Sequence, residues 1–169
     1  MRIYLITVAN KAPAWVVDGF NEYAKRMPPE ARLELVEVKP EPREGGKTAE
    51  QMMAAEARRI LAAVPKGATL VALDERGKDT DTKGLAKLLE GWLGGGADIA
   101  LVVGGPDGLA PEIKSKAAAL LRLSSLTLPH ALVRAVLAEA LYRARCARPS
   151  RRTEWCASAA SSWASRPMR

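Results

Sequence analysis

The sequence of 169 residues is poor in the side chains that build metal centres and disulfide frameworks. It has one histidine, His130, and two cysteines, Cys146 and Cys156, which lie near the C-terminus without the spacing of a metal site. It also lacks any run of about 20 apolar residues, the length that a membrane-spanning helix needs. These absences argue against a metalloprotein, a disulfide-stabilised secreted domain and a membrane protein.

The charge of the chain is unevenly distributed. Residues 145–169 hold six arginines and one acidic residue, Glu154, which leaves 20 basic and 18 acidic side chains in residues 1–144. The net charge of +7 is therefore weak evidence for nucleic-acid binding. No Val, Ile or Leu occurs after Leu141. We expect residues 1–144 to form a single domain and residues 145–169 to be a poorly ordered basic tail.

The N-terminal residues, MRIYLITV, have the content of a strand and lack the long apolar core and cleavage site of a signal peptide, so we expect a cytoplasmic protein. Residues 69–73 and 99–103 are short continuous apolar runs, typical of strands buried on both faces of a parallel sheet. Residues 119–123 form a third such run, for which a helix is the alternative. The alternation of strands and helices predicts an α/β fold. The other predicted elements are strands over 2–9 and 32–39 and helices over 13–23, 48–64, 82–93 and 130–145.

A loop rich in small or polar residues follows each of the three apolar runs: residues 73–78, 104–109 and 123–130. In open α/β sheets ligands bind at the carboxyl ends of the strands, so three such loops can form a site. Taken alone, residues 104–106 fit an ordinary turn, and a lone histidine at a helix start is more often structural than catalytic. No nucleophile and base have a spacing that indicates a catalytic pair. The residues by themselves predict an α/β domain with a loop-built ligand pocket.

Two longer motifs add a family resemblance. Residues 102–109, VVGGPDGL, and residues 123–134, LSSLTLPHALVR, resemble the signature of the RlmH family, the ribosomal RNA large subunit methyltransferases H. The resemblance continues through residues 138–144 and includes residues 1–23, so it covers the whole expected domain. It implies a SPOUT-type α/β knot, in which a parallel sheet carries a deep C-terminal trefoil knot.

The resemblance also implies an activity and its partners. The expected enzyme is an S-adenosylmethionine-dependent methyltransferase that methylates N3 of pseudouridine 1915 in 23S rRNA on the assembled ribosome. It is expected to be a homodimer with no metal and no membrane association, and the helix with Val133, Val136 and Leu137 is predicted to contribute to the dimer interface. The implied cofactor contacts are Leu73, Gly105, Leu123, Ser124, Ser125, Leu126, Thr127 and Leu128.

Two charged residues follow the third loop. By resemblance, Arg134 or Glu139 lines the reaction site, and the alternative for each is a surface or interface salt bridge. The family's short His-Pro-Tyr-His-Arg-Glu ending is expected to reach cofactor and substrate, whereas residues 145–169 contain neither histidine nor tyrosine. Two other functions are therefore kept open: a catalytically impaired homologue that binds cofactor and ribosome, and a non-catalytic nucleotide-binding module.

The difference in the tail predicts that the chain binds S-adenosylmethionine but methylates ribosomes slowly, because its arginines are not held in a preorganised arrangement. Grafting a family-type His-Pro-Tyr-His-Arg-Glu ending after Ala144, with the short family linker, should raise the single-turnover rate on unmethylated ribosomes sharply. If the ungrafted chain is equally fast, the tail is not needed for turnover.

Overall fold

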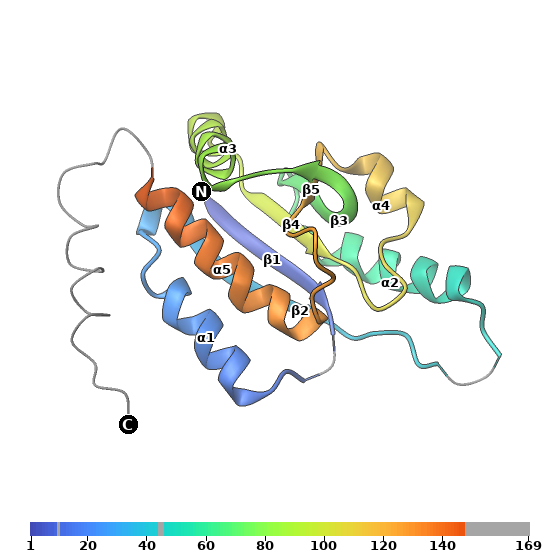
Figure 1. The fold of residues 1–169 in the computed structure, drawn as a ribbon. Helices are drawn as coiled ribbons and strands as arrows, with labels where there is room; N and C mark the ends of the chain where they lie inside the picture. The colour runs from blue at the N-terminus through green and yellow to red at the C-terminus, as the bar shows by residue number, and fades with distance from the viewer. Residues whose placement is uncertain (10, 44–45, 148–169) are drawn as a thin grey trace, which may run out of the picture.

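A computed structural model describes residues 1–9, 11–43 and 46–147, which form one α/β domain (Figure 1). The described strands are all parallel and pair in the order β2-β1-β4-β3-β5. The strands are β1 (Arg2–Val8), β2 (Arg32–Val38), β3 (Thr69–Asp79), β4 (Ile99–Val103) and β5 (Ala119–Arg122). The helices are α1 (Ala14–Ala24), α2 (Ala49–Ala63), α3 (Thr82–Gly95), α4 (Pro111–Lys116) and α5 (His130–Cys146), with a 3₁₀ turn η1 (Pro29–Ala31).

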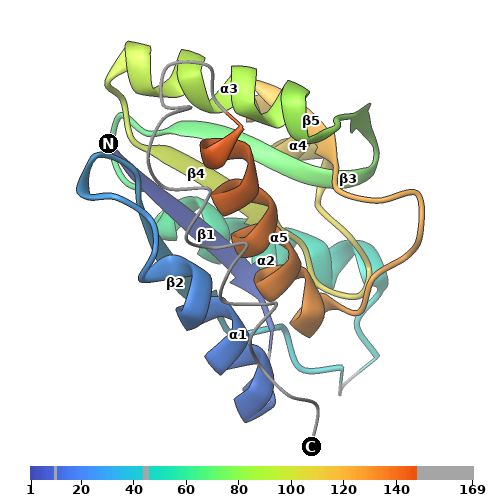
Figure 2. The ribbon, with the colours of Figure 1, turned by 60° about the vertical axis from the view of Figure 1, so that its left-hand side comes forward.

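The two faces of the sheet carry separate apolar cores. Along β1, Ile3 and Leu5 face α1, α3 and α5, whereas Tyr4, Ile6 and Val8 face α2 and α4. This alternation follows from the period of two along a strand and makes β1 buried on both faces. On the first face, α5 lies between α1 and α3 and packs against both (Figure 2).

Local signals in the sequence explain where the helices begin and end. Thr48 forms a capping box with Gln51: the Thr48 hydroxyl accepts the Gln51 backbone N–H at 3.3 Å, and the Gln51 side chain accepts that of Thr48 at 3.1 Å. Asp81 caps α3 by accepting the backbone N–H of Gly84 at 2.7 Å. Gly96 ends α3 in the left-handed region, at φ 71°. In the described part of the chain, no helix is long and apolar enough to cross a membrane.

The structure confirms the predicted strands and resolves the third apolar run as the strand β5. The short helix α4 was not predicted, because its six residues, Pro111–Lys116, are too few for a helical pattern to be visible. The prediction that the strand of residues 69–73 ends at Leu73 was wrong, since β3 continues to Asp79 after a register shift between Leu73 and Lys78. The predicted loop is thus an excursion within a strand. The predicted basic tail was to begin at residue 145, but Arg145 and Cys146 form the end of α5, and residues 148–169 of the tail lie outside the described residues.

The predicted contribution of α5 to a dimer interface needs correction at two residues. Val133 and Leu137 are buried in the core of the chain itself, at 8% and 2% exposure. They belong to the cluster on the α1, α3 and α5 face of the sheet. Their side chains are therefore already covered within one chain and cannot also line a surface between two copies.

Gly77 lies where β3 returns to β5 after the excursion. A Cβ at this position would lie 2.4 Å from the backbone carbonyl carbon of Leu121, and its other nearest atoms are also backbone. Relief would require one strand to move, because no flexible side chain can give way. Glycine is consequently a steric requirement of this crossing.

We expect Gly77→Ala to destabilise the domain by about 1–3 kcal/mol, the usual range for overpacking a rigid site. The matched control is Gly91→Ala inside α3, where a Cβ meets nothing within 4 Å. This control should stabilise the domain by about 0.5–1 kcal/mol, since alanine favours helix over glycine. Urea unfolding measures both. Equal stability of the two variants would contradict the crowding at Gly77.

Candidate functional site

Strand register brings the three predicted loops to one edge of the sheet. Leu73 of β3 pairs with Val103 of β4 on one side and with Leu121 of β5 on the other. Gly105 and Leu123 each follow two residues after those partners. The prediction that these segments lie together is therefore confirmed. Contact of their residues with a cofactor stays a prediction.

Residues 104–109 form a tight turn that leaves no space for side chains at its first positions. The backbone N–H of Gly108 donates to the carbonyl of Gly105 at 2.9 Å. Gly108 has φ +87°, a left-handed conformation that favours glycine. A Cβ at Gly104 would lie 2.6 Å from the Gly108 backbone. The interpretation of residues 104–106 as an ordinary turn thus describes their geometry correctly. The turn is also one of the three segments of the predicted site.

The segment between β5 and α5 combines apolar anchors with an exposed centre. Leu123 and Leu128 are half-buried and pack against the core, whereas the side chain of Leu126 is 74% exposed. Ser124 accepts the backbone N–H of Leu126 at 3.0 Å, which shapes the turn. Ser125 and Thr127 are exposed. The segment therefore presents an apolar side chain and hydroxyl groups to solvent beside the glycine turn.

Asp74 holds the excursion that follows Leu73. Its carboxylate pairs with Lys114 of α4 at 2.6 Å and accepts the backbone N–H of Arg76 at 3.0 Å, while only 8% of its side chain is exposed. Burial alone would raise the pKa of Asp74, but the hydrogen bonds from Lys114 and Arg76 outweigh it and hold the pKa below its usual value. The excursion is thereby tied to the neighbouring helix.

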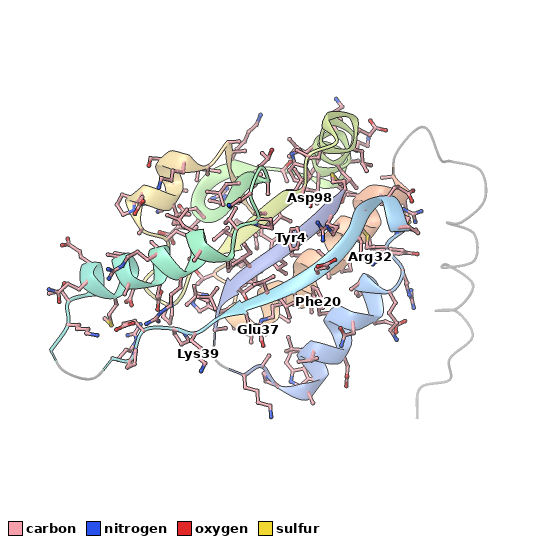
Figure 3. All side chains as sticks on the ribbon, turned by 180° about the vertical axis from the view of Figure 1, so that it is seen from behind. Tyr4, Phe20, Arg32, Glu37, Lys39 and Asp98 are labelled. Carbon is pink, nitrogen blue, oxygen red and sulfur yellow. The ribbon has the colours of Figure 1, made fainter. Side chains whose placement is uncertain are left out.

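The two residues predicted at the reaction site are both engaged in ion pairs. Arg134 is fully buried, and its guanidinium donates to Glu37 of β2, which is labelled in Figure 3. Glu139 is half-buried and pairs with Arg143 at 2.9 Å, one turn along α5. The Glu139–Arg143 contact matches the surface salt-bridge alternative, whereas Arg134 forms a buried ion pair within the chain, which is neither a surface nor an interface salt bridge. A role of either in the reaction stays a prediction.

A pocket of about 650 Å³ lies beside the glycine turn. Its walls come from the end of β1, residues 40–43, α2, Pro106 and Asp107 of the turn, and the start of α5 with His130. Arg43 and Asp107 form an ion pair of 2.9 Å across these walls. Among the described residues, no group of three or more histidine, cysteine or acidic side chains is arranged to hold a metal ion.

Sequence reasoning missed Glu56, a residue of α2 that lines this pocket and is only 5% exposed. Its neighbours at a spacing of four, Met52 and Ile60, are both buried. Glu56 thus lies on the apolar face of α2, where a carboxylate is unusual. That position in the helical pattern was the signal that could have identified it.

The contacts of Asp74 predict an acid-dependent loss of stability. A carboxylate with a depressed pKa in the folded state stabilises the fold above its unfolded pKa, and this contribution is lost as the pH falls through the folded value. Asp74→Asn should lower the unfolding free energy at pH 7 by about 1–2 kcal/mol. The difference from the parent chain should shrink below about pH 4, where aspartate protonates.

Urea unfolding at several pH values and constant ionic strength measures this difference. The control is Asp18→Asn at an exposed position of α1. A constant difference between Asp74→Asn and the parent chain down to the lowest pH would contradict the account.

Comparison with known proteins gives a consistent result. A family profile described as "Predicted SPOUT methyltransferase" matches residues 1–148. Proteins named ribosomal RNA large subunit methyltransferase H from Burkholderia vietnamiensis and Burkholderia mallei are 58% and 59% identical over 144 residues, which is 85% of this chain and 92% of each relative.

Solved structures share the fold. A probable methyltransferase from Bordetella pertussis Tohama I aligns with a TM-score of 0.51 at 19% identity, covering 85% of this chain and 95% of the other. A probable methylase family protein from Haemophilus influenzae Rd KW20 aligns with a TM-score of 0.51 at 16% identity, covering 90% and 69%.

The match to the family profile, together with close relatives over most of the chain, confirms the resemblance noted in residues 102–109 and 123–134. Enzymes of this class use S-adenosylmethionine as the methyl donor. The chain therefore belongs to the SPOUT methyltransferases and, within them, to the ribosomal RNA large subunit methyltransferase H family.

Proposed function

We propose that the chain transfers a methyl group from S-adenosylmethionine to N3 of pseudouridine 1915 in 23S rRNA. It does so as a homodimer on the assembled ribosome in the cytoplasm, and its sheet carries the trefoil knot of its class. The name of the relatives supports ribosomal RNA as the substrate class. The observation that carries the proposal is the pairing of Leu73 with both Val103 and Leu121, which gathers the three loop segments at one edge of the sheet.

The residues gathered at this edge fit the methyl donor. An adenosyl group needs apolar side chains against its ring and backbone groups at the ring edge. Leu73, Leu123 and Leu128 are half-buried apolar side chains from two of the segments. Gly105 contributes backbone without a side chain. Residues 123–129 have no regular secondary structure. In this proposal Leu73, Gly105 and residues 123–128 hold the cofactor.

The bound cofactor supplies an already activated methyl group. The remaining work of the chain is to hold the donor and acceptor in line and to accept the proton of N3 as the new bond forms. A carboxylate can accept the proton, and a guanidinium can stabilise the negative charge that develops on the base. Glu139 and Arg134 are proposed for these tasks. Because Glu139 pairs with Arg143 and Arg134 with Glu37, either must leave its ion pair to contact the substrate.

Two measurements on the full chain test the proposed function. Isothermal titration should show binding of S-adenosylmethionine, and single-turnover assays should place a methyl group on N3 in ribosomes that lack it. Binding without any methylation would identify the catalytically impaired homologue instead. Absence of binding would favour the non-catalytic nucleotide-binding module.

The role of Glu139 has a matched control. In the chain with the grafted ending, Glu139→Gln should lower the single-turnover rate by about 100-fold at saturating cofactor, the lower range for loss of a general base. Glu112→Gln removes a similar ion pair, with Lys116 one turn along α4, and should leave the rate unchanged. Equal rates for the two variants would remove Glu139 from the reaction site.

A further inference from the structure

Glu56 is one of three polar or charged residues in the described part of the chain that are buried over backbone and side chain together, with Thr7 and Arg134. Burying a carboxylate is costly unless its oxygens find partners, so its surroundings are informative. One oxygen, Oε1, accepts the backbone N–H of Glu41 at 3.0 Å. Glu56 therefore fixes the chain just after β2 from the side of α2.

The same face of α2 fixes this segment a second time. Arg59, three residues after Glu56, donates to the carbonyl of Lys39 at 3.0 Å and pairs with the carboxylate of Glu41. Lys47 also pairs with that carboxylate. Residues 39–41 are thus held by both backbone and side-chain contacts, and two of them, Pro40 and Glu41, line the pocket.

The other oxygen of Glu56 is directed at the glycine turn. Oε2 lies 2.9 Å from the point where a Cβ of Gly105 would be, and Val8 Cγ1 lies 3.4 Å from the same point. Only glycine lets the carboxylate approach the turn this closely. The Glu56 carboxylate thereby bonds to the segment after β2 and fills the space that a side chain at Gly105 of the turn after β4 would occupy. The exposed Arg43–Asp107 pair also joins them, but exposed ion pairs contribute little to stability.

We propose that Glu56 is a positioning residue, which holds the Gly105 turn in the conformation that binds the methyl donor. The proposal rests on the proposed function, because it takes Gly105 as a contact of that donor. The carboxylate acts by its shape and by the hydrogen bond to the Glu41 N–H. A glutamine, which keeps the length and one carbonyl oxygen, serves the same purpose. Alanine leaves a buried N–H without its acceptor and a space beside the turn.

The test measures the dissociation constant for S-adenosylmethionine by isothermal titration with the full chain and its variants. Thermal unfolding of each variant sets a titration temperature well below its midpoint, so that only folded protein is compared. We expect Glu56→Ala to raise the dissociation constant by roughly tenfold or more. Glu56→Gln should restore nearly the parent value, and Glu56→Asp, one methylene too short, should not. The control Glu50→Ala changes an exposed position of the same helix and should have no effect.

The amide resonance of Gly105 in a ¹H–¹⁵N spectrum gives a second readout that does not depend on the ligand. It should move in Glu56→Ala and stay in place in Glu56→Gln. Unchanged affinity in Glu56→Ala overturns the proposal, and so does a glutamine variant as weak as the alanine variant. If the parent chain itself fails to bind S-adenosylmethionine, the proposed function fails, whatever the Glu56 variants show.

Discussion

The rest of the structure depends on the hydrogen bonding of β3 to strands on both of its sides. Leu73 is paired with β4 and with β5 at the same point, so the excursion of β3 after Leu73 and the segments that follow β4 and β5 begin side by side. They cannot separate without breaking a parallel ladder that is buried between two layers of helices. The arrangement of these three segments is therefore a property of the sheet.

This close gathering of segments places steric demands on the chain. Gly77 is confined by the backbone of Leu121, Gly104 by the backbone of Gly108, and Gly105 by the side chain of Glu56. Each glycine is thus explained by close packing within the chain, whether or not a ligand is bound. Glycine in such a motif is first of all evidence of close packing within the chain. It indicates ligand binding only because of where the turn lies in the fold.

The sequence patterns predicted the strands and most helices because burial on two faces and amphipathic spacing are local properties. They also predicted that the segments after residues 73, 103 and 121 meet, because parallel strands end at one edge. Local pattern could not predict the continuation of β3 past Leu73, which depends on pairing with a strand about 40 residues later. The contacts of Arg134 with Glu37 and of Glu56 with Gly105 are likewise non-local. The family motifs supplied what spacing could not, namely the chemistry attributed to the site.

The strand order has a consequence for how the sheet can be extended. β2 is at one edge of the sheet, and its seven residues include Arg32, Glu34 and Glu37. A strand added at this edge would acquire three charged side chains as cross-strand neighbours, and Glu37 is already committed to Arg134. Charged edge strands resist uncontrolled sheet extension. The longer of the two edge strands is thus protected by its own side chains against pairing with a further strand.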